Sequence, residues 1–252
     1  MILTKVITVA LSCSALMLSA CSQQPLPRIN HYVGGSSESA SLAASAQSVQ
    51  VSGPITAGLV LINDTSTAGP ATVLSDKARA FLTHQVRERV QGATPIHVTQ
   101  VLTAADSSRP QGPEALAKLA REQGLAYLLV AVFSSAESEV PAYLPLTGDP
   151  EQGGSRPSVS GFEAVNYALA ELALVDAGSG QVIASSDGRA WARLNRLYVP
   201  KISNAYPVIH RSLRVAPIYP QESDAKDVLR SLAADEALEQ AATKLHEAWA
   251  KS

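Results

Sequence analysis

The sequence predicts a single α/β domain (α+β) in which helices pack on a mixed β-sheet. Two apolar runs, each followed by a helical stripe, have the pattern of strand–helix units. A later pair of β-type segments joined by a glycine-rich turn predicts a hairpin, and an amphipathic stretch ends the domain. The expected order of elements is β-α-β-α-β-β-β-α, over residues 55–250.

The first half of the domain alternates strands and helices. Each short apolar run is typical of a buried strand and leads into apolar residues spaced as on one helix face. The hydroxyl of Ser75 can cap the first helix, and Pro113 suits the first turn of the second. The expected bounds are strands over 57–62 and 95–102, helices over 75–91 and 113–124, and a third strand over 125–133.

The second half is predicted to hold a hairpin after a long loop. Residues 134–161 contain four prolines and four glycines, which predicts an irregular loop that is either functional or disordered. The run Asp176-Ala177-Gly178-Ser179-Gly180 is a strong turn signal. The expected bounds are hairpin strands over 164–175 and 181–193 and a closing helix over 224–250. Residues 208–215 have the pattern of an additional edge strand, outside the expected order of elements.

The N-terminal residues have the pattern of a secretory signal. Lys5 precedes the apolar run Val6–Leu18, which is too short to span a bilayer stably, and small residues follow it. The ending Leu18-Ser19-Ala20-Cys21 resembles the lipobox of bacterial lipoproteins. That resemblance implies a signal peptide over residues 1–20 and a diacylglycerol on Cys21 that anchors the protein to a membrane. The alternative is an ordinary cleaved signal with a coincidental cysteine.

The residue after the cysteine and the segment that follows suggest where the domain is held. Ser22, in place of Asp, implies sorting to the outer membrane in the enterobacterial pattern, with the domain facing the periplasm. Residues 22–54 are rich in Ser, Ala, Gln, Gly and Pro and almost free of charge. Such a composition cannot bury enough apolar surface to order itself. Residues 21–54 are therefore predicted to be the lipidated cysteine and a flexible tether.

Three segments also resemble a domain found in several envelope proteins. They are the strand that ends in Asn63-Asp64-Thr65-Ser66, the helix and strand over 119–130, and the hairpin over 172–182. They look like the domain shared by the amino-terminal region of the Tol-system β-propeller protein, the curli-secretion lipoprotein and the lipoprotein activator of penicillin-binding proteins. The resemblance covers about 55–193. It implies a protein-binding module or assembly subunit and no catalytic residues.

Composition and motifs point away from several function classes. The formal net charge of −2 argues against nucleic-acid binding. The two cysteines are Cys13, inside the signal, and Cys21, so no internal disulfide is expected. No G-x-S-x-G elbow, phosphate-binding glycine loop or H-E-x-x-H motif occurs, and the five histidines lack ligand spacing. We therefore predict no catalytic residue, metal or cofactor.

A basic, aromatic segment is the most unusual charge feature. Residues 188–221 hold six Lys and Arg, four aromatic residues and no acid. Arg and aromatic side chains are enriched at protein interfaces, and Arg also binds anionic groups. The predicted partner contacts are Arg189, Trp191, Arg193, Arg196 and Tyr198. The alternative is that this segment and the acidic stretch 134–176 neutralise each other within the domain.

Together these features predict a lipid-anchored cell-envelope protein whose domain is a protein-binding or assembly module. The expected partners are the membrane, through the lipid on Cys21, and another envelope protein or the cell wall. Two alternatives remain. One is an envelope hydrolase whose site is assembled by loop 134–161, and the other is an oligomeric structural or secretion subunit, since a homo-oligomer is compatible with the sequence.

Overall fold

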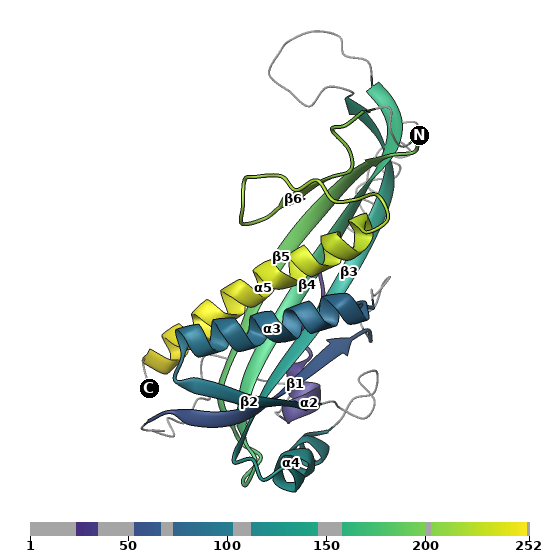
Figure 1. Cartoon of the computed structure of the whole chain (residues 1–252). Coiled ribbons are helices and arrows are strands. Elements are labelled where there is room, and N and C mark those ends of the chain that lie inside the picture. Colours follow the sequence, from purple (N-terminus) through teal and green to yellow (C-terminus); the bar gives the residue numbers. More distant parts are fainter. Residues whose placement is uncertain are drawn as a thin grey trace, which may run out of the picture.

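The computed structural model describes residues 24–34, 53–66, 73–102, 112–145, 158–199 and 203–250. It contains a mixed six-stranded sheet with helices on both faces (Figure 1). The elements are α2 (Ile29–Val33), β1 (Ile55–Asp64), α3 (Asp76–Ala93), β2 (Ile96–Leu102), α4 (Pro113–Glu122), β3 (Tyr127–Pro145), β4 (Ser158–Asp176), β5 (Val182–Leu197), β6 (Val208–Arg211) and α5 (Ala225–Ala250). The predicted fold class is confirmed, and α2 is an element that the sequence did not predict.

The strands lie in the order β2-β1-β3-β4-β5-β6. β1 pairs in parallel with β2 and β3, as expected for strand–helix units, whereas β3 to β6 pair antiparallel. β6 forms the edge, but it ends at Arg211 and so covers only the first half of the edge strand predicted over 208–215. No helix of the described ranges is long and apolar enough to cross a bilayer.

The predicted irregular loop over 134–161 is wrong for most of its length. β3 and β4 have 19 residues each and stay in register from Tyr127↔Asp176 to Pro145↔Ser158, so each strand is about 60 Å long. β1 pairs with β3 only as far as Ser134, which leaves the next part of β3 at the sheet edge. Proline is tolerated there because an edge strand needs no outward N–H, so Pro141 and Pro145 do not break the strand. Residues 146–157 lie outside the described ranges.

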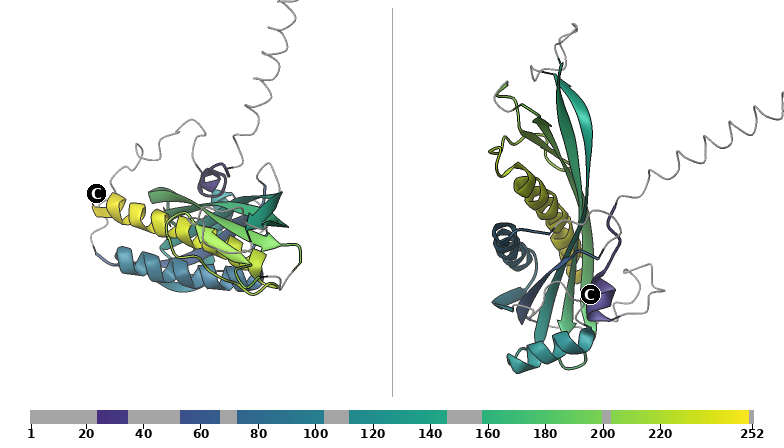
Figure 2. Two further views of the ribbon diagram at one scale, coloured as in Figure 1. Left: turned by 90° about the horizontal axis from the view of Figure 1, so that it is seen from above. Right: turned by 90° about the vertical axis from the view of Figure 1, so that its right-hand side faces the viewer.

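The hairpin of β3 and β4 continues past both helix layers (Figures 1 and 2). It removes the premise of a hydrolase site built by loop 134–161, because residues 134–145 and 158–161 form paired strands.

Strand alternation assigns each residue of the long strands to one of two faces. In β4, Ala170, Leu172 and Leu174 belong to the core beneath α3 and α5. The residues between them, Ala173 and Val175, belong to the core beneath α2 and α4. The sheet therefore separates two apolar cores, one on each face.

The predicted flexible tether is also partly wrong, because the domain begins before residue 55. Ile29, Tyr32 and Val33 lie in α2 and are buried in the second core. Their i, i+3, i+4 spacing places them on one helix face, a pattern hidden by the polar composition of the surrounding stretch. Residues 1–23 and 35–52 lie outside the described ranges.

α5 lies unusually close to β5 at Gly188. A Cβ atom at this position would lie 2.0 Å from the carbonyl oxygen of Ala237 and 2.6 Å from the amide nitrogen of Ala241. Both contacts are with helix backbone, which cannot rotate away. The alanine-rich side of α5, with Ala233 also buried, allows this approach.

We expect Gly188→Ala to destabilise the domain by about 1–3 kcal/mol, because the methyl group would force α5 away from the sheet. Chemical denaturation measures the free energy of unfolding. Gly92→Ala is the matched control: it lies in α3 with nothing within 4 Å of the added Cβ, so it should stabilise by up to about 1 kcal/mol. Equal effects of the two changes would contradict the close packing.

Candidate functional site

The five predicted contact residues do not form one surface. Trp191 pairs with Tyr167 and Arg193 with Val165, and these odd-numbered residues of β5 lie on the face that carries α2. Ala190, Ala192 and Leu194 alternate with them and belong to the core beneath α5. Arg196 therefore falls on the α5 face, and Tyr198 contacts Phe162 of that core. The period of two along a strand separates residues that are neighbours in sequence.

On the α2 face, a part of the sheet beyond the helices forms a surface that we call the open face. Figure 2 shows α2 and α4 near the end of the sheet that carries the β4–β5 turn, away from the hairpin end. Arg193 lies with its guanidinium carbon 5.5 Å from the centre of the Trp191 ring, and its Nε lies 3.6 Å from Glu163. By strand register, the open face consists of Ser138, Val140, Glu163, Val165, Tyr167, Trp191 and Arg193. Val140 and Arg193 are exposed, and the others are half-buried.

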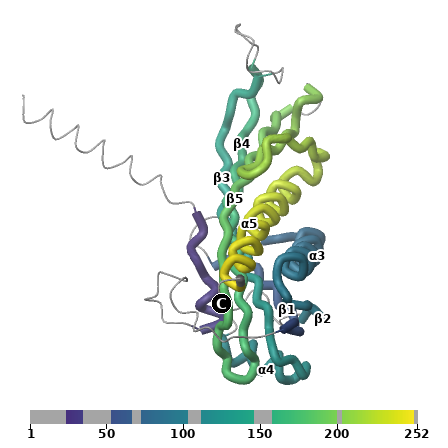
Figure 3. Tube along the Cα trace, turned by 90° about the vertical axis from the view of Figure 1, so that its left-hand side faces the viewer, coloured from purple at the N-terminus to yellow at the C-terminus, as the bar shows by residue number. Residues whose placement is uncertain are grey.

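The segment over residues 25–33, which we call the N-terminal strap, lies beside the open face. Glu171 of β4 accepts hydrogen bonds from the backbone N–H groups of Arg28, at 2.8 Å, and Ile29, at 3.2 Å. Arg189 donates from Nη1 to the carbonyl oxygen of the buried Pro25, at 3.1 Å. Figure 3 shows this segment on the side of the sheet away from α3. Arg189 thus holds the strap, a role that its place in a basic segment did not indicate.

Glu171 is fully buried, which raises the pKa of its carboxyl group to about 7. The two backbone N–H groups and Arg189 act in the opposite direction, and Asp187 acts in the same direction as burial. Burial dominates because a carboxylate loses its hydration when the strap covers it. The sequence could have marked Glu171 as a buried carboxyl group, because it is the single acid inside the apolar run 168–175 of a predicted strand.

The raised pKa of Glu171 predicts a pH dependence of stability. Between about pH 4.5 and about pH 7 the unfolded chain releases a proton that the folded domain keeps. The free energy of unfolding should therefore fall as pH rises through this window, by up to about 3 kcal/mol. Glu171→Gln keeps an acceptor oxygen and removes the titration, so denaturation at several pH values should give a wild-type-minus-variant difference that falls across the window.

The control for that experiment is Glu163→Gln, which removes a negative charge from a less buried position on the same strand. A difference between wild type and Glu171→Gln that stays constant from pH 4 to pH 8 would contradict the assignment.

The free end of the hairpin carries a second surface, which we call the aromatic tip: Tyr143, Tyr198 and Tyr206. Tyr143 pairs with Ser160 of β4, whose carbonyl oxygen accepts a hydrogen bond from the backbone N–H of Tyr198. The two tyrosines thus stand in one row across three strands, and they are 80% and 56% exposed. Tyr206 donates its hydroxyl to the carbonyl oxygen of Pro145, at 2.9 Å, which ties the 203–221 segment to the hairpin.

Acidic partners occupy most of the predicted basic segment. Arg196 forms an ion pair with Glu222, and its guanidinium lies 5.5 Å from the centre of the Phe162 ring. Glu236, buried in α5, accepts hydrogen bonds from the hydroxyl of Ser212 and the backbone N–H of Leu213, both at 3.0 Å. Further pairs join Arg211 to Glu236 and Arg214 to Glu239. Among the described residues, the basic segment thus forms ion pairs with Glu222, with Glu236 and Glu239 of α5, with Asp187 of β5 and, from the stretch 134–176, with Glu163.

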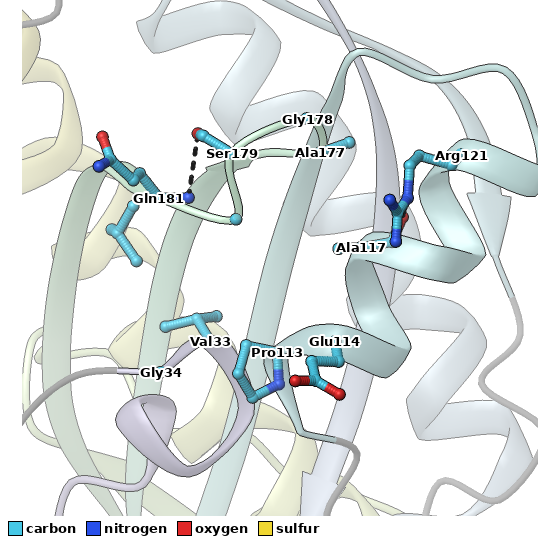
Figure 4. A pocket seen from close by; sticks show the side chains of 12 residues that line it. Val33, Gly34, Pro113, Glu114, Ala117, Arg121, Ala177, Gly178, Ser179 and Gln181 are labelled. Carbon is cyan, nitrogen blue, oxygen red and sulfur yellow. Dashed lines mark hydrogen bonds between the residues drawn. The ribbon is translucent and has the colours of Figure 1, made fainter.

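A pocket of about 720 Å³ lies at the opposite end of the domain (Figure 4). It is formed by the end of α2, by α4 and by the β4–β5 turn, and its charged lining residues are Glu114 and Arg121. Arg121 donates from Nε to the carbonyl oxygen of Ala117, at 3.2 Å, within its own helix. The backbone N–H of Ser179 lowers the pKa of Asp176 in the turn. The described lining residues include no His, Cys or Lys that could act as a general base beside Glu114.

Each of the five histidines lies in a different element: α2, α3, β2, β6 and α5. His84 lies 3.4 Å from Glu88 on α3, and His246 bonds to the carbonyl oxygen of Ala93. Within the described ranges, no three His, Cys, Asp or Glu residues are placed to hold a metal ion. Cys21 lies outside those ranges.

Neither a protein-family model nor a curated protein matches the chain. Two solved structures of a PelC dodecamer from Paraburkholderia phytofirmans are similar to it at 13% identity and a TM-score of 0.28; 78% and 72% of this chain are covered, and 89% of each PelC chain. A putative neuraminyllactose-binding hemagglutinin homolog from Helicobacter pylori has 11% identity and a TM-score of 0.33, over 79% of this chain and 88% of that chain. Similarities of this size carry no argument about function.

Proposed function

We propose that this chain is a lipid-anchored cell-envelope protein, attached through Cys21 to the periplasmic side of the outer membrane, whose domain binds another envelope protein. The lipobox-like residues 18–21 support the anchor. The aromatic tip, with Tyr143 and Tyr198 exposed in one row on either side of Ser160 at the end of a long hairpin, is the observation that carries the binding role.

Most of the surface of these two tyrosines does not take part in packing the core of the domain. Tyr143 extends beyond the core, and Tyr198 lies 5.9 Å from Phe162 with more than half of its surface open to solvent. Tyrosine contributes a large apolar area and a hydroxyl at low cost in conformational entropy, which is why it is enriched at the centres of protein interfaces. Cross-strand pairing holds the tip rigid, so little order is lost on binding.

The edge of β3 is less suited to binding by strand addition. Pro141 and Pro145 lack the N–H groups that a further strand requires. Glu137 and Glu139 are also held by Arg230 and Lys226 of α5, at 2.7 Å and 2.6 Å. The side chains of the tip are therefore the better docking surface.

A photo-crosslinking side chain at position 143, introduced in cells that produce the lipidated protein, tests the binding role. We expect one dominant envelope protein to be captured. Position 81 is the control, since Phe81 is 41% exposed on α3, away from the tip. Capture of the same proteins from both positions, or of further copies of this chain alone, would contradict the proposal.

The same surface gives a quantitative prediction once the partner is captured. Tyr143→Ala and Tyr198→Ala should each weaken the complex by about 2 kcal/mol, roughly 30-fold in Kd. Because both side chains are exposed, the free energy of unfolding should change by no more than about 0.5 kcal/mol. Titration calorimetry and denaturation measure the two quantities, with Phe81→Ala as the matched control. Full affinity in both tyrosine variants would remove the tip from the interface.

A further inference from the structure

The N-terminal strap ends next to the open face. Arg189, which holds the carbonyl oxygen of Pro25, pairs with Leu169, and the next same-face pair along these strands is Trp191 with Tyr167. Successive same-face residues of a strand are about 7 Å apart. The arginine that holds Pro25 therefore lies in the row of side chains next to that of the tryptophan.

Three residues, 22–24, separate Cys21 from Pro25. Four Cα-to-Cα steps span at most about 14 Å. A lipid on Cys21, which belongs to the proposed function and on which this inference rests, must then leave the bilayer within that distance of Pro25. The sequence predicted a flexible tether over 21–54. Because the strap is docked on Glu171, only residues 22–24 separate the proposed lipid on Cys21 from the folded domain.

We propose that the open face rests on the phospholipid headgroups of the anchoring membrane, with Trp191 and Tyr167 at the interface. Trp and Tyr favour the headgroup level of a bilayer because their rings are apolar and their N–H or O–H groups remain hydrated. Arg193 lies between the Trp191 ring and Glu163, within reach of lipid phosphates. Val140 and Val165 add apolar area on the same face.

This orientation leaves the second surface free. Tyr143 and Tyr198 lie on the opposite, α5-bearing side of the same strands. With the open face on the membrane, the aromatic tip turns toward the periplasm, where a protein partner can reach it. The two surfaces therefore act independently, and one can be altered without the other.

Trp191 is itself the probe for a direct test. The chain has two tryptophans, Trp191 and Trp249, so Trp249→Phe leaves the probe alone. The lipidated protein is reconstituted in vesicles of phosphatidylethanolamine and phosphatidylglycerol that contain a headgroup-labelled nitroxide lipid. We expect Trp191 emission to be quenched roughly threefold more than emission from the triple variant W191F/W249F/Y198W, whose tryptophan lies on the opposite face.

Cysteine labelling gives a second reading that leaves both tryptophans in place. Ser138→Cys puts a bimane fluorophore on the open face, and Ser160→Cys puts it on the other face of the same hairpin. The nitroxide lipid should quench the fluorophore at position 138 and spare the one at position 160.

Mass spectrometry of the mature protein distinguishes failure of the proposed lipid anchor from failure of the proposed contact between the open face and the membrane. A chain without diacylglycerol would overturn both the anchor and this inference. A lipidated, vesicle-bound chain with equal quenching on the two faces would overturn the inference alone and leave the anchor in place. Strong quenching at position 198 with none at position 191 would place the opposite face on the membrane.

Discussion

One buried carboxyl group, that of Glu171, joins the N-terminal strap to the sheet. Glu171 accepts two backbone N–H groups from the strap, and the strap excludes water from Glu171. Without the strap, the buried carboxyl group of Glu171 would lose two hydrogen-bond donors. Without Glu171, the two N–H groups of the strap would lose their acceptor, and both losses are unfavourable. This contact fixes where the chain enters the sheet. The same segment brings Pro25 to Arg189 and adds the apolar side chains of α2 to the second core.

The alternation of the long strands gives the hairpin two separate surfaces. Odd-numbered residues of β5 hold the strap at Arg189 and form the open face at Trp191 and Arg193, whereas Arg196 and Tyr198 belong to the α5 side. The stretch 189–198, which the sequence suggested was one basic patch, therefore has its side chains on two opposite faces of the sheet. In the arrangement that we propose, membrane contact and partner binding would use opposite sides of the same strands.

The sequence was sufficient for the fold class and failed where composition masked pattern. Continuous apolar runs and capped helical stripes predicted the sheet and its helices, because those signals are local. Ile29, Tyr32 and Val33 form a helical face inside a polar, Ser- and Ala-rich stretch, so averaging over that stretch hid α2. Pro141 and Pro145 suggested a loop because proline is excluded from central strands. β3 lies at the sheet edge at these positions only because β1 ends opposite Ser134, which the local sequence does not indicate. The five predicted contact residues lie on two faces of the sheet. This division could be recognised only from the pairing register of the strands, which local sequence does not give.

Amide hydrogen exchange at Arg28 and Ile29 tests the central claim most directly, since the account requires the strap to be part of the folded domain. Both amides donate to Glu171, so their exchange should be slowed by at least about 100-fold relative to an unstructured peptide. That protection should be lost in Glu171→Ala. Exchange of both amides at the rate of a free peptide in the wild-type protein would show that the strap is not docked on Glu171, and the proposed lipid on Cys21 would then no longer be held close to the sheet.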